Sequence, residues 1–116
     1  MSIQACADLV HRGDPDRFAA IMAAPVGARE RLFPIFAFNL EVARAPWVTA
    51  EAMIAEMRLQ WWRDALEEIA NGADVRRHEV TTPLSTAIDA ETATMLDRLV
   101  TARQWDIYTD PFDDQA

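Results

Sequence analysis

Apolar residues recur at intervals of three and four along most of this chain, which is the spacing of an amphipathic α-helix. Strict alternation of apolar and polar residues, which marks a half-buried strand, is rare. The pattern predicts helices over about residues 3–12, 15–24, 28–44, 50–70, 82–88 and 91–105. We therefore expect an all-α fold of about five to six helices, forming one domain over residues 1–116.

Residues that favour helix ends support several of these boundaries. Asp14 followed by Pro15 suits an N-cap and a first helical residue, and Thr49 can cap the fourth helix. Asn71 and Gly72 suit the end of that helix. The polar stretch from residue 73 to 82 then predicts an exposed linker before the last two helices.

Pro34 lies inside the third predicted helix. A proline in a helix interior removes one backbone hydrogen bond and costs about 3 kcal/mol. We therefore expect a kink there that packing supports, with a helix boundary at Pro34 as the alternative.

The same spacing predicts which side chains face the interior. On the first helix these are Ala5, Leu9 and Arg12, and the fourth helix is expected to lie centrally because it carries two apolar stripes. One stripe of the fourth helix is Ile54, Met57 and Trp61, and the other is Leu59, Trp62, Leu66 and Ile69. On the last helix the predicted inward residues are Met95, Leu96, Leu99, Val100 and Ala102.

Composition and charge exclude several classes of protein. The 116 residues are 51% apolar and carry a formal net charge of -8, so a nucleic acid or an anionic surface would be repelled on balance. The single cysteine, Cys6, cannot form an internal disulfide, and the N-terminus has no secretory signal pattern. No window approaches the length of an apolar membrane span. We therefore expect a cytoplasmic protein whose contact with a membrane, if any, is peripheral.

Two pairs of acidic residues stand at helical spacing and raise the question of a metal site. Carboxylates one helical turn apart can hold magnesium against a diphosphate. Asp64 with Glu68 is better explained as a solvated acidic face, and Asp106 with Asp110 as a cap or a solvated end. We predict no metal site and no catalytic residue in this chain.

The histidines and the cysteine do not form a recognisable site either. His11 and His78 are far apart in sequence, with no second ligand at metal-binding spacing, so surface histidine is the simpler interpretation. Cys6 with His11 lacks a third orienting residue for nucleophilic catalysis.

Trp61 and Trp62 are adjacent and therefore project about 100° apart on a helix. Core packing is the simpler role for them, with a ligand cavity or a partner surface as the alternative. Arg58 and Arg63 flank the pair and could hold an anion, although ion pairing with Glu41 or Glu67 is the simpler expectation.

Several segments resemble the squalene and phytoene synthases. Residues 16–18 read Asp-Arg-Phe and residues 31–38 read Arg-Leu-Phe-Pro-Ile-Phe-Ala-Phe, like the family's opening helices. Residues 59–63, Leu-Gln-Trp-Trp-Arg, resemble its tryptophan-containing helix, and residues 99–103 with Asp106 and residues 111–112 resemble the next landmark. The resemblance implies part of an isoprenoid-synthase-like helical bundle and, in the enzymes, head-to-head joining of prenyl diphosphates with magnesium.

The same resemblance implies that catalysis is lost. The family's first aspartate-rich motif should follow Phe38, but the positions similar to its acidic ones carry Ala43, Arg44 and Trp47. An arginine at that place would repel magnesium. Leu40 stands where the family has a diphosphate-binding arginine, and the sequence ends before the second motif is expected.

Residues 37–43 and 57–62 are most similar to a branch of the family that resembles mitochondrial complex I assembly factors and also lacks the catalytic aspartates. The resemblance implies a binding or assembly role, with a protein or an isoprenoid-like lipid as partner and no cofactor. The candidate binding residues are Phe36, Asn39, Glu41, Arg44, Arg58 and Trp62. The alternative is a head-to-head prenyltransferase completed by missing helices, which would need magnesium. A partial bundle would also expose apolar surface, which predicts a homodimer.

Overall fold

A computed structural model describes residues 2–47 and 51–108, and this part of the chain is all-α. The helices are α1 (Ser2–Gly13), α2 (Pro15–Met22), α3 (Val26–Arg44), α4 (Ala52–Ala70), α5 (Thr81–Ala87) and α6 (Ala90–Tyr108), with a short 3₁₀ turn, η1 (Ala45–Trp47), after α3. The predicted all-α fold is confirmed, and the predicted helix positions differ from the observed ones by a few residues at their ends. The predicted cap at Thr49 lies outside the described residues.

Local hydrogen bonds explain where several helices begin and end. The Asp14 carboxylate accepts a hydrogen bond of 3.1 Å from the Arg17 backbone N–H, which confirms the predicted cap of α2. At the end of α4, Gly72 adopts a positive φ of 67°, a conformation that glycine adopts at little cost. The N–H groups of Gly72 and Ala73 then donate to the carbonyls of Ile69 and Glu68, which closes the helix as a Schellman motif.

Pro34 lies inside α3 and is buried, so the helix continues through it and the alternative of a boundary at Pro34 is wrong. Residues before and after Pro34 in α3 are buried. The N-terminal part of α3 buries Phe33 and Pro34, and the C-terminal part buries Phe38 and Val42. Packing on both sides offsets the cost of the missing backbone hydrogen bond.

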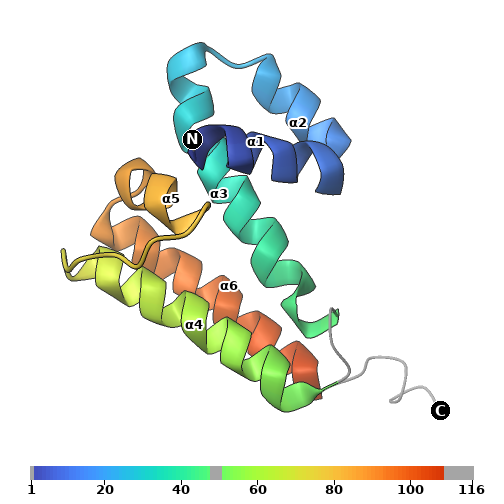
Figure 1. The fold of residues 1–116 in the computed structure, drawn as a ribbon, viewed down its shortest axis with the longest axis vertical. Coiled ribbons are helices and arrows are strands. Elements are labelled where there is room, and N and C mark those ends of the chain that lie inside the picture. The colour runs from blue at the N-terminus through green and yellow to red at the C-terminus, as the bar shows by residue number, and fades with distance from the viewer. Residues whose placement is uncertain (1, 48–50, 109–116) are drawn as a thin grey trace.

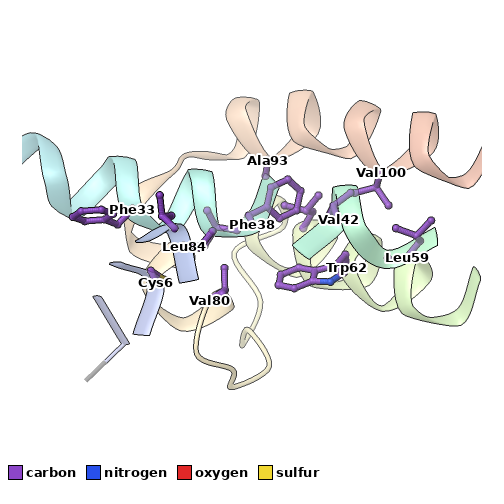
Figure 2. Packing of buried hydrophobic residues seen from close by; sticks show 14 of the residues in the cluster. Cys6, Phe33, Phe38, Val42, Leu59, Trp62, Val80, Leu84, Ala93 and Val100 are labelled. Atoms are coloured by element: carbon purple, nitrogen blue, oxygen red, sulfur yellow. The ribbon is translucent and has the colours of Figure 1, made fainter. Parts of the chain in front are cut away.

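The most extensive helix pair is α4 with α6, which run side by side in opposite directions (Figure 1). Helix α3 packs on this pair and also contacts α1, α2 and α5. Figure 2 shows Phe38 and Val42 of α3 near Trp62 of α4 and Val100 of α6. The Phe38 ring meets the Trp62 ring edge-on at 5.5 Å between centroids. One core cluster therefore joins the N-terminal helices to the α4–α6 pair.

The predicted inward faces of α1, α4 and α6 are wrong in part. On α4, Ile54 and Met57 of the first predicted stripe are 43% and 65% exposed, whereas Leu59, Trp62 and Leu66 of the second are buried as predicted. On α1 the buried residues are Cys6 and Val10, whereas Arg12 is exposed. On α6 they are Ala93 and Val100, whereas Met95 and Leu99 are 57% and 42% exposed. On α1 the apolar arc is centred near Cys6 and Val10, and Arg12 lies on the polar side of it. On α4 and α6 apolar residues lie on more than one side, so the arc that is buried depends on which neighbour packs against it.

None of the described helices combines the length and the apolar character needed to cross a membrane.

Candidate functional site

The C-terminal half of α3 forms one wall of a groove whose opposite wall is the end of α1. We call this hollow of about 760 Å³ the α1–α3 groove. Its lining residues are Leu9, Arg12, Gly13, Leu40, Ala43, Arg44 and Trp47. Four of them, Leu40, Ala43, Arg44 and Trp47, occupy the positions that the family resemblance assigns to diphosphate and metal binding. The structure thus brings all the altered motif positions to one surface.

The chemistry of this groove is apolar and cationic. The guanidiniums of Arg12 and Arg44 are its charged groups, and no carboxylate is present among the described residues that line it. Gly13 lets α1 come close to α3, because a Cβ atom at this position would lie 3.1 Å from Leu40 Cδ1. Trp47 is 65% exposed at the end of the groove. Such a lining suits an apolar ligand that carries negative charge.

A second hollow lies on the other side of Arg44, between α3 and α4. We call it the α3–α4 pocket, and its volume is about 420 Å³. It is lined by Glu41, Arg44, Ala45, Arg58, Trp61, Trp62 and His78. Since Arg44 lines both hollows, the groove and the pocket are neighbouring parts of one surface.

Aromatic rings form the floor of the α3–α4 pocket. The ring centroids of Trp61 and Trp62 are 5.0 Å apart and meet edge-on, and the His78 ring lies 5.2 Å and 5.4 Å from them. His78 Nδ1 accepts a hydrogen bond of 3.0 Å from the Val80 N–H, which orients the imidazole. His78 was expected to be a surface histidine, and the residue is exposed, but its ring packs on both tryptophans.

The linker that carries His78 is held to α4 by an ion pair. Arg76 donates to both carboxylate oxygens of Glu68, at 3.0 and 2.8 Å, and its guanidinium lies 5.2 Å from the Trp61 ring centroid. These hydrogen bonds lower the pKa of Glu68 below its usual value and raise that of Arg76. Sequence reasoning missed this arrangement, because the linker's polar composition gives no sign of where it folds back.

The arginines near the pocket differ in how they are paired. Arg44 lies 3.9 Å from Glu41, a loose contact between partly exposed side chains. Arg63 was expected to pair with Glu41 or Glu67 but instead binds Asp97 of α6 at 2.9 Å. Among the described residues, no carboxylate forms an ion pair with Arg58, so the expected partner for it is absent. Arg58 therefore lines the pocket without an ion pair to any carboxylate of residues 2–47 and 51–108.

Of the six candidate binding residues, the structure brings Glu41, Arg44, Arg58 and Trp62 together in the α3–α4 pocket. The other two lie elsewhere. Arg17 lies 4.7 Å from the ring centroid of Phe36, which is half-buried. Asn39 is exposed and lines neither hollow.

The described carboxylates of the two acidic pairs at helical spacing contact other side chains of the protein. Asp64 accepts a hydrogen bond from Gln60, and Asp106 pairs with Arg103 at 3.2 Å, whereas Asp110 lies outside the described residues. Within residues 2–47 and 51–108, no three His, Cys, Asp or Glu side chains are grouped in a way that could hold a metal ion.

Comparison with known proteins identifies relatives of two kinds. The family model for squalene/phytoene synthase matches residues 10–116. Over 64 residues, the chain is 30% identical to the human protein named NADH dehydrogenase (ubiquinone) complex I, assembly factor 6, and 33% identical to its Drosophila melanogaster homolog. The bovine protein of the same name is 28% identical over the same length.

These matches cover 54–55% of this chain but only 19% of each relative's length. No solved structure matches. The family model spans nearly the whole chain, including α3, α4 and every lining residue of the two hollows except Leu9. The chain therefore belongs to the squalene/phytoene synthase family.

Proposed function

We propose that this chain is a non-catalytic member of its family that acts by binding a protein partner, without a metal or another cofactor. The observation that carries the proposal is the chemistry of the α1–α3 groove. Ala43, Arg44 and Trp47 line it at the positions where the resemblance calls for magnesium-binding carboxylates. A guanidinium repels a divalent cation, and an alanine and a tryptophan supply no oxygen ligand.

The relatives support an assembly role over an enzymatic one. Each of the three is named as assembly factor 6 of NADH dehydrogenase (ubiquinone) complex I or its homolog, a name that refers to assembly and not to prenyl transfer. An isoprenoid-like lipid is the second candidate ligand, because Leu9, Leu40, Ala43 and Trp47 give the groove an apolar lining. We also propose that the protein is cytoplasmic and that its contact with a membrane is at most peripheral.

The test is incubation of the protein with farnesyl or geranylgeranyl diphosphate and magnesium, with diphosphate release as the measurement. We expect no release above the level without protein. Release that depends on the protein would contradict the proposal and favour the alternative, a prenyltransferase completed by further helices.

A variant with restored acids sharpens this test. Ala43→Asp with Trp47→Asp places two carboxylates at a spacing of four residues on the wall of the groove. We expect calorimetry to detect weak magnesium binding to this variant and none to the unmodified chain. Equal magnesium binding by the two proteins would mean that the altered motif has no bearing on metal affinity.

We also propose a two-fold homodimer. Met53 of α4 and Met95 of α6 are 73% and 57% exposed, and exposed apolar surface of this kind is commonly covered by a second copy. Light scattering should give twice the monomer mass of 13.1 kDa. A monomer at high protein concentration would rule the dimer out.

A further inference from the structure

Positive charge gathers around the two hollows that Arg44 joins. Arg12, Arg44 and Arg58 line the α1–α3 groove and the α3–α4 pocket, and Glu41 is the one carboxylate among the described lining residues. The chain as a whole has a formal net charge of -8. This surface is therefore a local cationic patch on an acidic protein, and it would attract a negatively charged ligand.

The charges of this patch are weakly neutralised within the protein. Among the described residues, Arg12 and Arg58 form no ion pair, and Arg44 reaches Glu41 only at 3.9 Å. By contrast, Arg63, Arg76 and Arg103 contact carboxylates at 2.8–3.2 Å. The three arginines of the patch are thus available for an external counter-ion, and their guanidiniums suit bidentate contact with carboxylates.

Apolar side chains lie beside these arginines. Leu40, Ala43 and Trp47 line the groove next to Arg44. On α4, Ile54 is one helical turn before Arg58 and Met57 is one turn before Trp61, so both lie on the helix surface next to residues that line the pocket. Ile54 and Met57 are 43% and 65% exposed, and a flexible methionine can adapt to the shape of a partner.

We propose that this patch binds an acidic amphipathic helix of a partner protein, which lies along the C-terminal half of α3. Its apolar face fills the α1–α3 groove, and its carboxylates meet Arg12, Arg44 and Arg58. This is the helix-in-groove mode of recognition. The inference rests on the proposed function, because it names the kind of segment through which the protein partner is bound.

The placement of the arginines favours a helix over a lipid. The three residues belong to three different helices, α1, α3 and α4, and they line two separate hollows. A lipid presents its negative charge in one headgroup, whereas an acidic helix can present a carboxylate at every turn. A nucleic acid also carries repeated charge, but the net charge of -8 opposes its approach.

The experiment is selection from a display library of random helical peptides against the full chain, followed by affinity measurement on synthetic peptides. We expect the enriched peptides to be amphipathic, with Glu or Asp beside the apolar face. Binding should weaken at least about tenfold in each of the variants Arg12→Glu, Arg44→Glu and Arg58→Glu, since charge reversal replaces attraction by repulsion. Binding should also weaken as salt is raised.

The matched control is Arg98→Glu, which makes the same change of charge at an exposed position of α6 that lines neither hollow. It should bind the peptides like the unmodified chain. Circular dichroism on all four variants shows whether each keeps its helices.

Three outcomes would overturn the inference: no enriched peptide, enriched peptides without acidic residues, or equal loss of binding in Arg98→Glu. Binding of phosphatidylglycerol vesicles that depends on Arg44, in the absence of peptide binding, would assign the patch to an anionic lipid instead. These results are independent of the diphosphate assay. A chain that releases diphosphate fails the proposed function whichever peptides it binds, and a chain that releases none can still fail this inference.

Discussion

Cys6 belongs to α1, and its thiol is buried in the core where α1 meets the residues that lead into α5. Its exposed fraction is zero, and its sulfur lies 3.5 Å from the carbonyl oxygen of Glu79. Burial, and to a lesser extent the negative charge of Glu79, raises the pKa of this thiol to about 12. Since the thiolate is the reactive form, Cys6 is held in its unreactive state.

We predict that Cys6 of the native protein does not react with Ellman's reagent at pH 8 and reacts fully once urea unfolds the chain. The reaction rate should follow the fraction of protein that is unfolded. Rapid reaction in the absence of denaturant would show that α1 does not pack as described. A sequence search for a Cys–His nucleophile pair cannot detect this burial, because the pairing of Cys6 with the segment near Glu79 joins residues 73 positions apart.

At the scale of elements, the Glu68–Arg76 ion pair fixes the linker between α4 and α5. It positions the loop that brings His78 over Trp61 and Trp62. The pKa of Glu68 is lowered, chiefly by the side-chain hydrogen bond from Arg76, so folding favours the charged carboxylate. The stability that this pair contributes is therefore present above the unfolded pKa of about 4.3 and is lost as the pH falls through the lower pKa of the folded state.

We predict that Glu68→Gln lowers the melting temperature by at most a few degrees at pH 7, because the pair is partly solvated. The difference from the unmodified chain should shrink as the pH falls below the unfolded pKa, because the carboxylate is protonated first in the unfolded state and only at a lower pH in the folded state. Thermal melts between pH 3 and 7 give the measurement. Glu67→Gln, at the exposed neighbouring position on α4, is the matched control and should show no such pH-dependent difference.

The elements themselves were largely predictable, whereas their inward faces were predictable only in part. Asp14 with Pro15 and Asn71 with Gly72 act through nearby backbone groups, so the ends of α2 and α4 can be inferred from the sequence alone. On α6, Met95 and Leu99 share an apolar stripe with Val100, yet only Val100 is buried. Periodicity identifies apolar arcs, but the position of the neighbouring helix decides which arc is covered.

At the scale of the whole molecule, some residues of the candidate site could be predicted from local sequence, whereas others join the site only through tertiary packing. Arg44, Arg58 and Trp62 could be singled out because they lie in or beside recognisable segments of α3 and α4. Arg12 and His78 reach the site from α1 and from the linker, which are distant in sequence. Their contribution depends on tertiary packing, above all on the cluster that joins α3 to the α4–α6 pair.

Phe38 is central to that cluster, since it is fully buried and its ring lies against Trp62. We predict that Phe38→Ala lowers the free energy of unfolding by about 3–5 kcal/mol, the usual cost of removing a buried aromatic side chain. That loss is a large part of the roughly 5–15 kcal/mol that stabilises a typical domain. Urea unfolding followed by tryptophan fluorescence gives the measurement.

Leu99→Ala is the control, because the sequence predicts Leu99 to be buried whereas the structure places it at the surface of α6. Leu99 is 42% exposed on α6, so its truncation should cost well under half as much as that of Phe38. Equal destabilisation by the two substitutions would mean that α6 buries its Met95–Leu99 side, and that α3 does not pack on the α4–α6 pair through Phe38 as described.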